Sequence, residues 1–297
     1  MTQKICVITG ANSGIGKAAA IQIAQQGYRV IMACRSQERS AAALQDVRTQ
    51  SGSDDVELMR VDMSSQASIR AFADAYLAKY DVLDVLIHNA AMFDINQKEI
   101  IFTDEGIERV WATNHIGPVL MTDLLLDALK ASEQGRIITI SSKGLIMYPF
   151  LKVDLEDPEF RNRKFSVQKA YYQSKQAQVM YTYWLADQLK NTAVTANSIR
   201  VTNVQIDVDN RYPTTNKWLR KMYSLKSKFS ITPAHMAETY TYLATSPDVA
   251  TTTGTYYDDP KHIVSSNGYS KNPANIEALM VTTMKYLHNS HTVPNTL

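Results

Sequence analysis

A tyrosine and a lysine four residues apart are the pair in this sequence best suited to chemistry. Tyr171 and Lys175 lie in the proline-free run 167–189, where a spacing of four places both side chains on one face of a helix. An ammonium beside a phenol favours the phenolate, so the phenol can give or take a proton near neutral pH. The pair is therefore a candidate general acid or base for a carbonyl or an alcohol.

The Tyr-x-x-x-Lys spacing alone is a weak signal, because the chain contains 16 tyrosines and the spacing occurs three times. A proline inside each of the other two copies opposes the helix that would align the side chains. These copies are Tyr148/Lys152 with Pro149 and Tyr257/Lys261 with Pro260. We expect them to have no part in the chemistry.

Composition describes a globular protein with ample material for a core. Of its 297 residues, 45% are hydrophobic and 20% are charged, and the net charge is only +2, which argues against a nucleic-acid-binding protein. Cys6 and Cys34 lie in apolar runs, which favours buried thiols over a disulfide. No apolar run reaches membrane-spanning length, and the polar start is too short for a signal peptide, so a cytoplasmic protein is expected.

A glycine-rich turn follows the first apolar run, 4–9, and leads into an alanine-rich helical stretch. Glycines let a backbone approach a pyrophosphate, and a helix N-terminus offers free N–H groups to it. The alternative is an ordinary tight turn into a helix. The strand–turn–helix context favours a dinucleotide site at Gly10, Asn12, Ser13, Gly14, Ile15, Gly16 and Lys17.

The second predicted strand, 28–34, ends at Arg35, with no acidic residue before Glu38. At this position an acidic side chain holds the free ribose hydroxyl of NAD, whereas an Arg accommodates the 2′-phosphate of NADP. Lys17 could add a second positive charge. NADP(H) is therefore the predicted cofactor, although both cations could be solvated surface residues.

Three later strands also end in polar or small residues. The third, 56–61, ends at Asp62 and Met63, where Asp62 could accept a hydrogen bond from an adenine amino group or cap the next helix. The fourth, 82–87, runs into Asn89 and Ala90, which would leave room for a ribose, while His88 is expected to be a satisfied buried histidine. The fifth, 136–140, leads to Ser142, a candidate hydrogen-bond donor to a substrate oxygen.

Strands and helices alternate along the whole chain, and further strands are expected at 194–199 and 254–257. We predict an α/β fold: a single Rossmann-type domain over 1–297, with a doubly wound parallel sheet of about seven strands and helices on both faces. A long helix is expected from Asp104, holding Asn114 and kinked at Gly117-Pro118. No metal site is indicated.

Together these landmarks resemble the short-chain dehydrogenase/reductase family over nearly the whole chain. The residues that carry the resemblance are Thr9-Gly10-x-x-x-Gly14-Ile15-Gly16, Asp62, Asn89-Ala90, Asn114, Ser142 and Tyr171-x-x-x-Lys175. Three further stretches look most like the retinol-dehydrogenase and protochlorophyllide-reductase branch, whose members favour NADPH. They are Ala33-Cys34-Arg35-Ser36, Asn114-His115-Ile116-Gly117 and Thr253-Gly254-Thr255-Tyr256.

The resemblance implies a role for each member of a catalytic group. Ser142 would polarise a carbonyl oxygen and Tyr171 would transfer the proton. Lys175 would lower the phenol pKa and hold the nicotinamide ribose, and Asn114 would anchor a water of the proton relay. The implied function is NADP(H)-dependent interconversion of a carbonyl and an alcohol by hydride transfer, on a small and apolar substrate, with a homodimer as a possible assembly.

The sequence departs from the family pattern in three places. Ser142 and Tyr171 are 29 residues apart, which indicates an insertion at about 143–170; Ala91 replaces a usual glycine. Val201-Thr202 replaces the usual Pro-Gly where backbone meets the nicotinamide, which leaves open a non-enzymatic NADP(H)-binding sensor or scaffold. The mixed aromatic and basic stretch 205–231 is predicted to cover the substrate, or else to be an ordinary surface helix.

Overall fold

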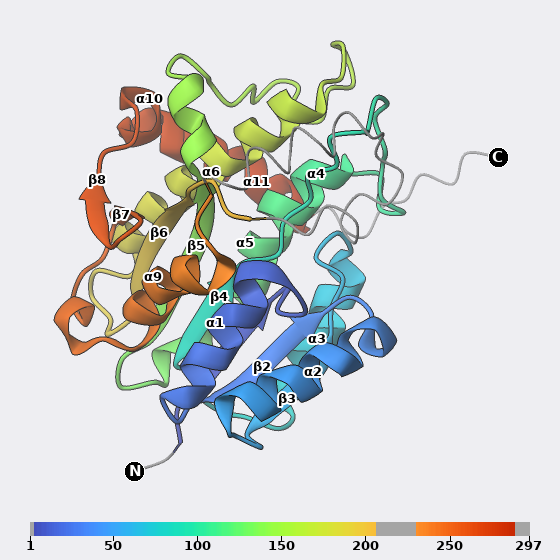
Figure 1. The fold of residues 1–297 in the computed structure, drawn as a ribbon. Coiled ribbons are helices and arrows are strands. Elements are labelled where there is room, and N and C mark those ends of the chain that lie inside the picture. The colour runs from blue at the N-terminus through green and yellow to red at the C-terminus, as the bar shows by residue number, and fades with distance from the viewer. Residues whose placement is uncertain (1–2, 206–229, 289–297) are drawn as a thin grey trace.

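The computed structural model describes residues 3–205 and 230–288, and the account below concerns these residues. One sheet of eight strands runs through the described part of the chain in the order β3-β2-β1-β4-β5-β6-β7-β8. All neighbouring strands are parallel except β7 and β8 (Figure 1). The strands are β1 (Ile5–Thr9), β2 (Arg29–Cys34), β3 (Val56–Arg60), β4 (Val85–His88), β5 (Arg136–Ser142), β6 (Thr195–Val201), β7 (Thr255–Asp258) and β8 (His262–Val264).

Helices follow most of the strands and cover both faces of the sheet, as predicted for a doubly wound fold (Figure 1). The longer ones are α1 (Gly14–Gln25), α2 (Gln37–Ser51), α3 (Gln66–Leu77), α5 (Gly117–Lys130), α6 (Val167–Gln188), α9 (Pro233–Thr245) and α11 (Pro273–His288). The shorter ones are α4 (Arg109–Trp111) and α10 (Gly268–Lys271). The sequence predicted about seven strands. The eighth, β8, has only three residues, which is too short for an alternation of apolar and polar residues to indicate a strand.

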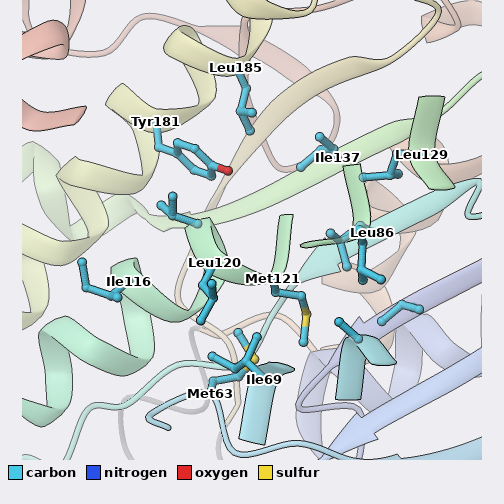
Figure 2. Close-up of a cluster of buried hydrophobic side chains, with 14 of the residues drawn as sticks. Met63, Ile69, Leu86, Ile116, Leu120, Met121, Leu129, Ile137, Tyr181 and Leu185 are labelled. Atoms are coloured by element: carbon cyan, nitrogen blue, oxygen red, sulfur yellow. The ribbon is translucent and has the colours of Figure 1, made fainter. Parts of the chain in front are cut away.

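Alternation along the strands divides the core into two layers. In β1, Val7 packs with the layer under α3, α5 and α6, whereas Cys6 and Ile8 pack with the layer under α1, α2 and α9. Figure 2 shows part of the first layer, where Leu86 and Ile137 of the sheet lie among side chains of α3, α5 and α6. Both cysteines are buried free thiols, as predicted.

The region before Asn114 differs from the single long helix expected from Asp104. Phe102 pairs with Glu108 in an isolated β-bridge, and α4 begins only at Arg109. The Glu108 carboxylate accepts hydrogen bonds from the backbone N–H groups of Val110 and Trp111, so it fixes the start of the helix. Glutamate is an uncommon N-cap residue. The predicted helix start, Asp104, is therefore five residues before the observed start at Arg109.

Residues Ala112–Ile116 form a turn of π-helix between α4 and α5, with Asn114 at its centre. Pro118 has no N–H to donate to the carbonyl of Asn114, four residues earlier, and a π turn accommodates that loss. The kink was expected at Gly117-Pro118, but the irregular geometry is a π turn just before it, centred on Asn114. Helix α5 then continues regularly to Lys130.

The insertion at 143–170 begins with a short 3-10 helix, Lys143–Met147, and continues without regular structure to α6. Most of the predicted substrate-covering region, residues 206–229, lies outside the described residues, so its role stays a prediction. Its flanks are joined by backbone hydrogen bonds from Gln205 N to Ile231 O (2.9 Å) and from Ile231 N to Asn203 O (3.1 Å). Over the ranges 3–205 and 230–288, no helix combines the length and apolar character needed to cross a membrane.

Candidate active site

Helix α6 places Tyr171 and Lys175 one turn apart, because no proline interrupts it and Ser166 caps its start. Lys175 is buried, at 2% exposure, and its Nζ donates a hydrogen bond to the backbone oxygen of Ile140 (2.8 Å). The same Nζ lies 5.6 Å from the centre of the Tyr171 ring. A cation is thus held beside a half-buried phenol at the C-terminal end of β5.

The other two Tyr-x-x-x-Lys copies are not helical. Tyr148 ends the 3-10 helix of the insertion, and Tyr257 is buried in β7. Lys261 follows the β7 strand in a turn, where its Nζ lies over the ring of Tyr242 at 5.1 Å. Within the described residues, the helical arrangement belongs to Tyr171/Lys175 alone, as the prolines predicted.

Ser142 ends β5 and shares the catalytic end of the sheet with Lys175. Its Oγ accepts a hydrogen bond from the backbone N–H of Gly144 (3.2 Å), which turns the chain away from the strand. An added Cβ on Gly144 would come within 2.4 Å of the Tyr172 hydroxyl, so the chain after Ser142 lies directly against the residue next to Tyr171. Tyr172 therefore holds the start of the insertion against the turn of α6 that carries Tyr171.

Asn114 joins the loop after β4 to helix α6. Its Oδ1 accepts a hydrogen bond from Met92 N (2.6 Å), and its Nδ2 donates to Met92 O (3.0 Å) and to Ser174 Oγ (3.0 Å). Ser174 in turn donates to the backbone oxygen of Tyr171 (2.7 Å). The buried amide therefore fixes both the loop and the turn of α6 that carries the phenol.

Ser174 was missed by the sequence reasoning, although a signal for it exists. A serine three residues after Tyr171 on a helix can donate to that residue's carbonyl, which is a common local pattern. Phe93 was missed as well; its ring lies 4.5 Å from that of Tyr171 and covers one face of the phenol. No local pattern marks Phe93, because the contact depends on how the loop after β4 folds back.

The glycine-rich loop between β1 and α1 has the shape that a pyrophosphate site needs. Gly10 has φ +67°, and a Cβ there would meet the Cα of Ala90 at 3.0 Å. Gly14 has φ +55° and open space where a Cβ would point. A Cβ on Gly16 would meet Asn89 Nδ2 at 2.4 Å.

The start of α1 also leaves its backbone donors available. Ser13 occupies the N-cap position but makes no side-chain cap, and the first turn carries no acidic residue, whereas Ser36 and Ser65 cap α2 and α3. Asn12, Ser13 and Gly14 are exposed, Ile15 and Lys17 are partly buried. Uncapped amides beside open glycines fit the phosphates of a dinucleotide.

Positive charge near the end of β2 and the start of α1 is carried by two side chains. Arg35 is exposed at the end of β2, where no acidic residue precedes Glu38. Lys17 was predicted to join it, but its Nζ lies 2.9 Å from Asp46 Oδ2 on α2. An exposed pair of this kind contributes at most about 1 kcal/mol, so a bound phosphate can compete for the ammonium.

Asp62 and Met63 form the turn after β3. Asp62 Oδ1 accepts hydrogen bonds from the backbone N–H (2.9 Å) and hydroxyl (2.7 Å) of Ser64, and the cap of α3 is Ser65. The alternative that Asp62 caps the helix is therefore wrong; its carboxylate shapes the turn. Met63 is buried, and its carbonyl packs so closely on Gly117 that a Cβ there would come within 2.3 Å.

Asn89 and Ala90 lie against the glycine-rich loop. Asn89 Nδ2 donates to the backbone oxygens of Thr9 (2.9 Å) and Gly10 (3.2 Å), and the Ala90 N–H donates to Thr9 Oγ1 (2.9 Å). His88 is buried with its Nε2 2.7 Å from Thr122 Oγ1, and burial lowers its pKa to about 3. It is a buried neutral histidine, as expected, but it is only partly satisfied, because its Nδ1 is buried without a hydrogen-bond partner among the described residues.

Comparisons with known proteins agree with these features. Residues 4–152 match the family model for short chain dehydrogenases. Human retinol dehydrogenase 13 is 33% identical over 263 residues, covering 87% of this chain and 77% of the relative. Mouse retinol dehydrogenase 14 is 35% identical over 272 residues, covering 88% and 79%. The human dehydrogenase/reductase SDR family member 13 is 36% identical over 259 residues, covering 86% and 65%.

Among solved structures, an uncharacterised protein from Mycobacterium paratuberculosis has a TM-score of 0.72 and 27% identity, with 96% of this chain and 93% of that chain covered. A short chain dehydrogenase from Salmonella enterica serovar Typhi shares the fold, with a TM-score of 0.63, 23% identity and coverage of 86% and 96%. The chain is an oxidoreductase of the short-chain dehydrogenase/reductase family and belongs to its retinol-dehydrogenase branch.

Proposed function

We propose that this protein interconverts a carbonyl and an alcohol with NADP(H) as cofactor and Tyr171 as the acid or base. The observation that carries the proposal is the buried Lys175, whose Nζ is fixed by Ile140 O beside the Tyr171 ring. A cation in that position favours the phenolate and so prepares the phenol to give up or regain a proton.

The remaining side chains prepare the substrate oxygen and the proton path. Ser142, at the end of β5, donates a hydrogen bond to the oxygen that becomes negative during reduction. Asn114 holds the turn of α6 through Ser174, and by the family resemblance it would also anchor a water of the proton relay. When bound, a nicotinamide cofactor supplies or accepts the hydride.

The glycine-rich loop and the first turn of α1 would hold the pyrophosphate, with Asp62 and Met63 near the adenine and Asn89 and Ala90 near the ribose. Arg35 would pair with the 2′-phosphate that distinguishes NADP from NAD. Lys17 would add a second contact once it leaves Asp46. These assignments make NADPH the expected reductant.

An apolar substrate is supported by side chains of the insertion, which follows Ser142 in the chain. Ile146, Met147 and Phe150 of the insertion are exposed by 55%, 78% and 92%. Phe93 covers a face of Tyr171. Exposed apolar groups beside a polar catalytic group suit a substrate with a long apolar body and one oxygen.

A screen of NADPH oxidation with aldehydes, ketones and quinones tests the proposal. Turnover of an apolar carbonyl compound, with NADH less effective at equal concentration, is the expected result. The alternative is a cofactor-binding sensor or scaffold, and its support is Val201-Thr202 in place of Pro-Gly. Tight NADPH binding with no turnover across the panel, in either direction, would favour that alternative.

A further inference from the structure

Three charged side chains meet where β5, β6 and β7 end side by side (Figure 1). Arg200 Nη2 lies 2.7 Å from Asp258 Oδ2, and Lys143 Nζ lies 3.1 Å from the same oxygen. Asp258 is 6% exposed; burial raises the pKa of its carboxyl, but the two cations outweigh burial and hold that pKa below its usual value. The carboxylate is therefore an ionised, nearly buried link between the two cations.

The ion pairs lie just beyond the backbone pairing of β6 with β7. The register of β6 with β7 ends at Ile199 and Tyr257, one residue before Arg200 and Asp258. The register of β5 with β6 ends at Ser142 and Val201. Arg200 and Val201 are thus still paired with β5. Beyond Ile199 and Tyr257, however, no ladder joins β6 to β7 in the part of the chain that the structure describes, and the Asp258 carboxylate joins these two strands through side chains.

The segment that follows Arg200 is the one that departs from the family pattern. Val201-Thr202 stands where a Pro-Gly turn usually presents backbone to the nicotinamide. A proline fixes its own φ and restricts the residue before it, whereas valine and threonine leave the backbone freer. This backbone is held toward β5 by the pairing of Val201 with Ser142, and after Thr202 by the hydrogen bond from Ile231 N to Asn203 O. A constraint toward β7 must come from side chains.

We propose that Asp258 is a positioning residue for the nicotinamide half of the cofactor. By holding Arg200 and Lys143, it fixes the end of β6, and with it the backbone at Val201-Thr202, relative to β7, and so replaces part of the constraint that a Pro-Gly turn would give. The inference rests on the proposed cofactor. It concerns the nicotinamide half only, because Arg35 and the glycine-rich loop at the other half lie on β2 and the β1–α1 turn.

Removing the carboxylate would leave Arg200 charged and mostly buried without its anion. An arginine does not lose its proton in proteins, so the side chain must move toward water and the strand end must move with it. A merely stabilising role for Asp258 would instead weaken the whole fold, and all parts of the cofactor would be affected alike. The two roles therefore differ in which half of the cofactor loses affinity.

The test compares NADPH with 2′,5′-ADP, which carries the adenosine and 2′-phosphate but no nicotinamide. Dissociation constants for both ligands and the melting temperature of the ligand-free protein are measured for Asp258→Asn and Lys143→Met. Asp187→Asn is the matched control, because Asp187 forms an exposed ion pair with Lys190 on the surface. All measurements use the full chain.

We expect Asp258→Asn to raise the dissociation constant for NADPH by about tenfold or more, since about tenfold corresponds to the loss of one charge-assisted contact. The dissociation constant for 2′,5′-ADP should change by less than about twofold. Lys143→Met, at a half-exposed site, should weaken NADPH by about threefold with an unchanged melting temperature. Asp187→Asn should alter neither ligand.

The inference would be overturned if Asp258→Asn lost affinity equally for NADPH and 2′,5′-ADP. It would also be overturned if the ratio of the two dissociation constants stayed unchanged in both variants. If Asp258→Asn does not fold, the ratio in Lys143→Met decides. An unmodified protein that binds neither ligand would overturn the proposed cofactor and this inference together. If the unmodified protein binds NADPH tightly and the variants keep its ratio of dissociation constants, this inference alone would be overturned.

Discussion

Replacing Glu108 by glutamine should change how stability depends on pH. Glu108 has no exposed surface, and its backbone N–H donates to Glu159 Oε2 at 2.7 Å. Burial, and secondarily the charge of Glu159, raises the pKa of the Glu108 carboxyl to about 7, against the lowering effect of the Val110 and Trp111 amides. The native state therefore keeps a proton there at a pH where the unfolded chain has released it.

The sign and size of the effect follow from that difference. A raised carboxyl pKa stabilises the native state most at low pH, and the stabilisation is lost as pH rises from about 4.5 to about 7. One pKa unit is about 1.4 kcal/mol, which allows a loss of up to about 3 kcal/mol by pH 8. Glutamine has the shape of the protonated acid and no charge to bury, so Glu108→Gln escapes this loss.

Urea unfolding at pH 5 and pH 8 measures the effect. The stability of Glu108→Gln relative to the unmodified protein should increase by about 2–3 kcal/mol between the two pH values. Glu156→Gln, at an exposed carboxylate of the insertion, is the control and should show no such change. A Glu108→Gln protein whose stability keeps the same pH dependence as the unmodified one would refute the reasoning.

Three cofactor predictions follow from the site. Arg35→Ala should weaken NADPH by about tenfold to a hundredfold and leave NADH nearly unchanged, because one phosphate contact is lost; equal binding of both cofactors by the unmodified protein would contradict it. Gly16→Ala should abolish NADPH binding in a fluorescence titration, since its Cβ would overlap Asn89; normal affinity would show that the loop yields. Asp46→Asn should tighten NADPH up to about threefold by releasing Lys17, whereas weaker binding would mean the ion pair orients the lysine productively.

Much of this fold could be predicted because its parallel strands are nearly continuous apolar runs that end in glycine, serine or aspartate. The run that ends at Thr9 and the run 136–140 predicted the first and fifth strands; the observed fifth strand continues to Ser142. Since ligands meet the carboxyl ends of parallel strands, the same reasoning placed the candidate site residues at one edge. The helix with Tyr171 and Lys175 followed from the absence of proline.

The parts that could not be predicted depend on contacts between distant segments. Glu108 caps α4 because the chain before it folds back into the Phe102–Glu108 bridge. Helix propensity carries no sign of this bridge, so the predicted helix began too early. The ion pair of Lys17 with Asp46 has no local signal, because the two residues are 29 positions apart in the sequence. Asp258 likewise has no local signature, since its partners Arg200 and Lys143 come from two other strand ends.

Turnover by Tyr171→Phe tests the central claim most directly. The hydroxyl is needed as the substrate oxygen gains or loses its proton, so its removal should lower kcat by about 10²–10⁴ while NADPH binding stays within about twofold. Tyr257→Phe, in β7 and away from the helical pair, is the control and should keep near-normal kcat on the same substrate. Near-normal kcat in Tyr171→Phe on a confirmed substrate would contradict the account, above all if Tyr257→Phe lost activity.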